Sequence, residues 1–121
     1  MPYIVGSTGV SALSLTAGVV NSGVTTTSST GQSVLIEVSS SFYRSVNFQV
    51  QAIRGTNYNT TNIQVLHDGS QTFMSEYGTI NHPSGIATFS TDLSGGNIRL
   101  LGFPSTSDLT RFNIIYTAQK A

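Results

Sequence analysis

Apolar and polar side chains alternate along the chain from residue 33 onward, which is typical of β-strands with one buried face. The clearest alternation runs over residues 45–52, where serine, asparagine and glutamine separate the apolar positions. The side chains expected to face the core there are Val46, Phe48, Val50 and Ala52. The same period puts Val34, Ile36 and Val38 on one face of the preceding strand.

Further strands are expected at 86–93, 97–101 and 110–118, the last with Phe112, Ile114 and Tyr116 on one face. Turn-forming residues separate the runs, and no window of ten or more residues keeps helical spacing with capping residues. The pattern predicts an all-β fold, an antiparallel β-sandwich of jelly-roll-like form, with a small β-barrel as the alternative.

The first 31 residues carry no charged side chain, and Glu37 is the first one in the chain. Two interpretations stay open for 1–31: a Ser/Thr/Gly-rich strand of the same domain, or an extended arm that packs on a neighbour. Few large side chains are present to offset the entropy of ordering this segment, so we expect it to gain order from a partner surface. Residues 32–121 are then the β-sandwich domain.

The stretch NIQVLHDGSQTFMSEYGTI (62–80) predicts a hairpin. A three-residue loop, His67-Asp68-Gly69, pairs Ile63 with Phe73 and gathers the large apolar groups, Tyr77 included, on one face. A two-residue Asp68-Gly69 turn would mix the faces, so the first register is preferred. His67 and Asp68 are then expected at the tip of the loop.

A second hairpin is predicted in DLSGGNIR (92–99). A two-residue Gly95-Gly96 turn pairs Leu93 with Ile98 and places Asp92 directly across from Arg99. The side chains expected on its core face are Phe89, Leu93, Ile98 and Leu100.

Charge is scarce, since Asp, Glu, Lys and Arg make up 8% of the 121 residues and the net charge is zero. No basic field exists to gather nucleic acid or an anionic membrane, and neither partner is expected. A sparsely charged surface also repels its own copies weakly, which favours permanent assembly. We therefore expect a homo-oligomer, with a trimer favoured.

Chemistry-bearing residues do not form a recognised catalytic or metal-binding pattern. His67, Asp68 and a serine could make a triad, but no G-x-S-x-G turn surrounds any serine. His67, Asp68 and His82 lack metal-ligand spacing, and the chain has no cysteine. We expect no enzyme activity, no catalytic, cofactor-binding or metal site, and no cofactor.

Glycan binding is the more serious rival, because β-sandwiches commonly present aromatic platforms to sugars. The chain has no Trp, and Tyr77 and Tyr116 fall on faces assigned to the core. Tyr43 and Tyr58 remain as possible platforms, although a partly buried tyrosine is the more ordinary role.

Two runs, IQVLHDGSQTFMSEYGTI (63–80) and ATFSTDLSGGNIRLLGFP (87–104), resemble a β-domain of virion structural proteins of tailed bacteriophages, notably those infecting cyanobacteria. The elements that carry the resemblance are the VLHDG turn, the triplet Glu76-Tyr77-Gly78 and the hairpin from Asp92 to Leu101. They lie in the second half of the chain, and residues 1–45 do not contribute.

The resemblance implies a multi-copy structural role in the virion without catalytic residues. It favours a capsid cement or decoration protein whose partners are the major capsid protein or other virion proteins. The alternatives are a tail-fibre, neck or baseplate component, and, from a different class, a glycan-binding β-sandwich module.

Overall fold

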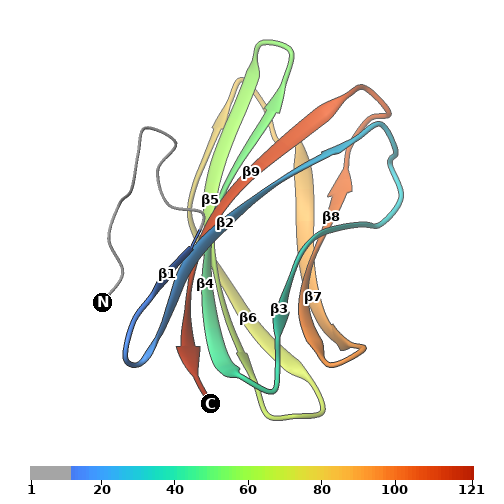
Figure 1. Cartoon of the computed structure of the whole chain (residues 1–121). Helices are drawn as coiled ribbons and strands as arrows, with labels where there is room; N and C mark the ends of the chain where they lie inside the picture. The colour runs from blue at the N-terminus through green and yellow to red at the C-terminus, as the bar shows by residue number, and fades with distance from the viewer. Residues whose placement is uncertain (1–11) are drawn as a thin grey trace.

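The structure, a computed structural model, describes residues 12–121, which form nine antiparallel strands and no helix. The strands are β1 (Ala12–Ser14), β2 (Gly18–Thr27), β3 (Ser33–Ser39), β4 (Tyr43–Arg54), β5 (Asn57–His67), β6 (Thr72–His82), β7 (Ala87–Ser94), β8 (Asn97–Pro104) and β9 (Thr110–Lys120). They make a six-stranded sheet, β1-β2-β9-β4-β5-β6, and a three-stranded sheet, β3-β8-β7, packed face to face (Figure 1). The predicted antiparallel β-sandwich is confirmed, and the two sheets do not join into one closed sheet.

The core is built on the two central strands of the larger sheet, β4 and β9. Strand β4 buries all four apolar side chains predicted for it, each at most 2% exposed: Val46, Phe48, Val50 and Ala52. Strand β9 buries Phe112, Ile114 and Tyr116, also as predicted. The rings of Phe48 and Tyr116 pack with their centroids 5.7 Å apart. Each large apolar side chain buried in this way contributes roughly 1.5 to 3 kcal/mol.

Strand β3 departs from the predicted alternation. Leu35 and Val38 are buried at 3% exposure and Ile36 packs against the core, whereas Val34 is 38% exposed, so Val34 does not share the core face with Ile36 and Val38. The cause is a register shift against β8 between Val34 and Ile36, which leaves Leu35 as an extra residue. Leu35 packs over Gly102, where an added Cβ would lie 2.9 Å from the Leu35 Cδ1.

The hairpin of β7 and β8 follows the sequence-based prediction. Gly95 and Gly96 form the turn with φ of 58° and 81°, values that suit a two-residue hairpin turn. Asp92 pairs with Arg99, and two hydrogen bonds of 2.7 and 2.6 Å join the guanidinium to the carboxylate. The hydrogen bond from Arg99 holds the pKa of Asp92 below its ordinary value. Glu37 of β3 lies across from Arg99 on its other side.

The N-terminal part that the structure describes belongs to the larger sheet. Strand β2 pairs with β9 along its whole length, from Gly18 opposite Gln119 to Thr27 opposite Thr110. A side chain at Gly18 would collide with the carbonyl oxygen of Ala118, so the close pairing requires glycine there. Of the segment 1–31, residues 12–27 thus contribute strands β1 and β2, and residues 1–11 lie outside the described part.

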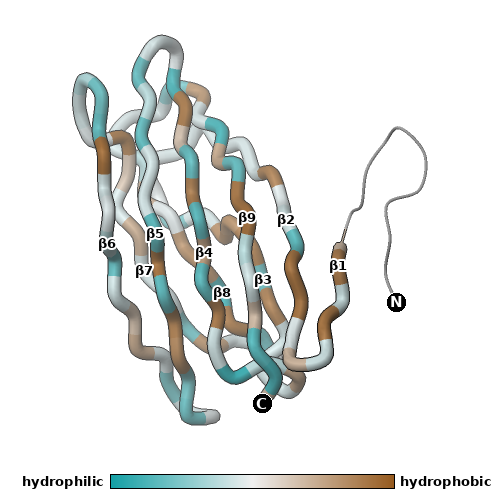
Figure 2. Tube along the Cα trace, turned by 90° about the vertical axis from the view of Figure 1, so that its left-hand side faces the viewer, coloured by the Kyte–Doolittle hydropathy of each residue, from teal (hydrophilic) through white to brown (hydrophobic). Residues whose placement is uncertain are grey.

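Figure 2 faces the larger sheet, whose strands follow one another from β6 to β1 with the three-stranded sheet behind. The smaller sheet has half as many strands, so it cannot cover the larger one completely. Strand β6 is the least covered, because ten of its eleven residues are exposed and Thr72 alone is half-buried. The uncovered strand is where the sequence-based assignments and the structure differ most.

Candidate functional site

The hairpin of β5 and β6 has a different register from the predicted one. Leu66 pairs with Phe73 and Val65 with Met74, so four residues, 68–71, connect the strands instead of three. Ile63 lies opposite Glu76 rather than Phe73. Phe73 therefore points away from the core and is 49% exposed.

The side chain of Asp68 stabilises the longer loop. Its Oδ1 accepts hydrogen bonds from the backbone N–H groups of Ser70 (2.9 Å) and Gln71 (3.0 Å) and from the Ser70 hydroxyl (2.9 Å). The backbone bonds of Ser70 and Gln71 are the main reason that the pKa of Asp68 falls to about 2. Gly69 adopts the left-handed conformation expected for it, with φ of 97°. Asp68 is a turn residue, as the sequence indicates.

His67 is buried at 3% exposure and is not a solvent-facing residue of the loop tip. Its Nδ1 accepts a 3.0 Å hydrogen bond from the Gly69 N–H, so Nε2 carries the proton and donates to the Tyr43 carbonyl at 2.7 Å. Arg44 also donates to the His67 carbonyl, at 3.3 Å. His67 therefore connects the β5–β6 turn to the start of β4, a structural role.

The residues weighed for metal or acid–base chemistry are not brought together. His67 and Asp68 lie at one end of β6, and His82 lies exposed at the other end of this eleven-residue strand. Within residues 12–121 no group of three or more His, Asp or Glu side chains could hold a metal ion. The same residues include no helix long and apolar enough to cross a membrane.

The tyrosines are placed differently from the sequence-based assignment. Tyr116 is buried at 7% exposure, as predicted, but Tyr77 is 44% exposed on the outer side of β6, where its hydroxyl accepts a 3.0 Å hydrogen bond from Asn47. Tyr43, a possible sugar platform by sequence, packs against the core instead. Tyr58 is 50% exposed and stays available as a platform.

A group of exposed apolar side chains lies on β6 and its neighbour β5, with Met74 on the inner side of the larger sheet and the others on its outer side. Its large side chains are between 37% and 65% exposed: Tyr58, Leu66, Phe73, Met74, Tyr77 and Ile80. Strand β6 also ends the sheet, so alternate backbone N–H and C=O groups have no strand beyond them in the described chain. We call residues 72–77, the regular part of β6 before its bulge, the β6 edge.

The outward side of the larger sheet beside the β6 edge is rich in amides. Its partly or fully exposed members are Asn47, Gln49, Gln51, Asn62, Gln64 and Asn113, here called the amide face. They stand opposite one another across strands, as Gln49 does with Asn62 and Asn47 with Gln64. The amide face carries hydrogen-bonding groups of both kinds and no charge, so it does not repel a second copy.

Sequence reasoning missed the β6 edge because it assigned Phe73 and Tyr77 to the core. A signal was present, since TFMSEYGTINH (72–82) mixes apolar and polar residues on both faces, unlike the strict alternation of β4. Such mixing indicates an edge strand that is covered on neither side.

The fold and these surfaces define an antiparallel β-sandwich with one long uncovered sheet edge. No protein-family model matches the chain, and no curated protein sequence matches it. Among solved structures it is similar to the tailspike protein of Acinetobacter phage vB_ApiP_P1, with a TM-score of 0.50 and 18% sequence identity. The match covers 84% of this chain and 22% of the tailspike chain, so the likeness concerns the fold of one part of a longer protein.

Proposed function

We propose that this chain is a non-enzymatic structural component of a phage virion. The observation that carries the proposal is the shared fold with part of a phage tailspike over 84% of the chain. The resemblance of residues 63–80 and 87–104 to phage virion domains supports it independently. The structural roles of His67 and Asp68 support the absence of catalysis, because their hydrogen bonds serve the turn.

The position in the virion has two candidates. The sequence resemblance favours a capsid cement or decoration protein bound to the major capsid protein. The tailspike likeness favours the tail, where a fibre, neck or baseplate component would also carry an exposed β-sandwich. Both candidates place the protein in the virion in several copies.

The decisive experiment is to locate the protein on the particle. Virions of the phage that encodes the chain are purified, separated into heads and tails, and analysed by mass spectrometry and by immunogold electron microscopy. A signal on heads supports the cement protein, and a signal on tails supports the second candidate. Absence of the chain from purified particles would refute both.

We further propose that neighbouring copies meet at the β6 edge. An added strand would pair with its free backbone groups and cover Phe73 and Tyr77, both of which are about half exposed. The positive φ of Gly78, 67°, bends the strand after residue 77 and limits regular pairing to residues 72–77.

Sedimentation analysis of the purified protein tests this contact. Phe73→Lys together with Tyr77→Lys should shift the population towards monomer. Pairing of two copies through this edge would bring the new lysines of one copy close to those of the other, and like charges repel. Ile115→Lys on β9, at a position 54% exposed, is the matched control and should leave the assembly unchanged. A purely monomeric parent protein, or equal effects at both sites, would exclude the β6 edge as the contact.

A further inference from the structure

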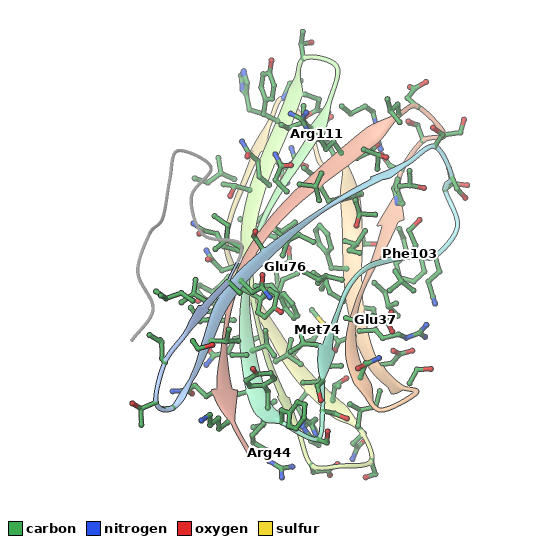
Figure 3. All side chains as sticks on the ribbon, viewed as in Figure 1. Glu37, Arg44, Met74, Glu76, Phe103 and Arg111 are labelled. Carbon is green, nitrogen blue, oxygen red and sulfur yellow. The ribbon has the colours of Figure 1, made fainter. Side chains whose placement is uncertain are left out.

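A cleft opens between β6 and β7, on the inner side of the larger sheet where the three-stranded sheet leaves it uncovered. Its volume is about 200 Å³. Its lining includes the polar side chains of Thr61, Glu76, Thr79 and Asn81 and the apolar side chains of Ala52 and Phe89. In the view of Figure 3, the labelled Glu76 lies between the ribbons of the two sheets.

A β-bulge in β6 creates the polar wall of this cleft. The register against β5 shifts between Thr60, opposite Ile80, and Asn62, opposite Tyr77. Two residues of β6, Gly78 and Thr79, therefore stand opposite the single residue Thr61. Gly78 has φ of 67°, and the bulge turns Glu76 and Thr79 to the same side of the sheet. Bulges of this kind commonly redirect side chains towards a site.

Both redirected side chains converge on the hydroxyl of Thr61, which is buried at 3% exposure. Thr61 Oγ1 lies 2.7 Å from Thr79 Oγ1 and donates to Glu76 Oε2 at 3.1 Å. Thr79 also donates to the same carboxylate oxygen, at 3.3 Å. These bonds hold the Glu76 carboxylate in place at the cleft through Oε2, and its second oxygen, Oε1, accepts no hydrogen bond from the described residues.

The chemistry of the lining selects a class of ligand. A carboxylate accepts hydrogen bonds from hydroxyl groups, and the Asn81 amide both donates and accepts. Ala52 and Phe89 offer an apolar wall for the C–H groups of a ring. The lining contains a carboxylate and no cationic side chain, so it disfavours acidic ligands. One carboxylate is also too few for a calcium or magnesium site.

We propose that this cleft binds one neutral sugar ring of a glycan, with Glu76 accepting hydrogen bonds from two neighbouring ring hydroxyls. The volume is below the roughly 300 to 1,000 Å³ of pockets for drug-sized molecules, which limits the ligand to a single ring. The site lies apart from Tyr58 and from the amide face. It does not depend on the position of the protein in a virion.

NMR titration of the ¹⁵N-labelled full chain tests the site with the methyl glycosides of glucose, galactose, mannose, N-acetylglucosamine, fucose and rhamnose. At least one should give saturable shifts of the Thr61, Glu76, Thr79 and Asn81 amides at millimolar concentration. Methyl glucuronide, an acidic sugar, should give none. Failure of all six neutral glycosides to produce saturable shifts would overturn the proposal.

Two conservative variants test the residues. Glu76→Gln and Thr79→Val should each weaken binding about tenfold or more. The first variant removes the charged acceptor of the sugar hydroxyls, and the second removes a hydroxyl that holds this acceptor in place. Ser75→Ala, on the opposite side of the same strand, is the control and should bind as the parent does. Unchanged thermal unfolding shows that a variant is folded, and unchanged affinity in both folded variants would place the sugar elsewhere. Particle localisation is independent of these results.

Discussion

At the scale of single residues, the β5–β6 turn is held by side chains that resemble catalytic ones and have structural partners. His67 satisfies the Tyr43 carbonyl and the Gly69 N–H from a buried position, and Asp68 satisfies the N–H groups of the loop. A histidine next to an aspartate is therefore explained by the hydrogen-bonding needs of the backbone.

Replacing His67 by alanine should destabilise the protein by about 1 to 3 kcal/mol, because two part-buried hydrogen bonds to the backbone are lost. Urea denaturation of the variant measures the loss in the free energy of unfolding. His82→Ala, which changes an exposed histidine at the other end of β6, is the control and should have little effect. Equal stability of the two variants would contradict the role assigned to His67.

Asp68 should make stability depend on pH in the acid range. Its pKa is lowered from 3.8 to about 2 in the folded protein, so the charged form stabilises the fold. This contribution is fully present above about pH 4 and is lost as pH falls towards pH 2. As pH falls between these values, the free energy of unfolding measured by urea denaturation should decrease less for Asp68→Asn than for the parent. Asp108→Asn, in another exposed loop, serves as the comparison, and an Asp68→Asn profile parallel to that of the parent would refute the assignment.

At the scale of elements, local pairing rules explain the β7–β8 hairpin but not its surroundings. The Gly95-Gly96 turn fixes the opposition of Asp92 and Arg99. The neighbouring strand β3 adds Glu37 on the other side of Arg99, and its carboxylate further favours the charged guanidinium, raising the pKa of Arg99 after the larger effect of Asp92. The ion pair therefore belongs to a three-strand arrangement.

Reversing both charges, with Asp92→Arg and Arg99→Asp, should recover only part of the stability that the single reversals lose. The new aspartate would stand opposite Glu37, and like charges across strands are unfavourable. A double-mutant cycle by thermal unfolding measures the coupling. Adding Glu37→Gln should restore the remainder, and zero coupling between positions 92 and 99 would show that the side chains do not interact.

At the scale of the whole molecule, two sheets of unequal width determine which surfaces are free. The three-stranded sheet covers the centre of the larger one, where β4 and β9 form the core. It leaves β6 without cover, which exposes both the β6 edge and the polar cleft. The segment 12–27 closes the opposite side, since β2 pairs with β9 and β1 with β2.

Removing residues 1–31 should therefore damage the fold rather than free an independent domain of residues 32–121. Strand β9 would lose a ten-residue partner and present a long unpaired edge, which promotes aggregation. Size-exclusion chromatography with light scattering and thermal unfolding provide the measurement. A chain lacking only residues 1–11, which keeps β1 and β2, is the control. A soluble monomer of 32–121 with the parent's melting temperature would show that β2 is dispensable.

Features that depend on neighbouring residues can be predicted from the sequence alone. Strict alternation defines β4 and β9, because it gives each strand one apolar face. That face must be buried in a core, whichever element packs against it. The glycine pair defines the β7–β8 turn and its register. The resemblance to phage virion domains likewise came from short local runs.

Features that depend on the order and width of the sheets follow from the tertiary structure. His67 is buried because β4 starts beside the β5–β6 turn, and Leu35 replaces Val34 in the core because β3 meets Gly102 of β8. Phe73 and Tyr77 are exposed because the observed register against β5 turns both side chains to the outer side of the larger sheet, away from the smaller one. Glu76 faces a cleft because a bulge shifts its strand against β5. Each is set by contacts between residues far apart in the chain, which local periodicity does not determine.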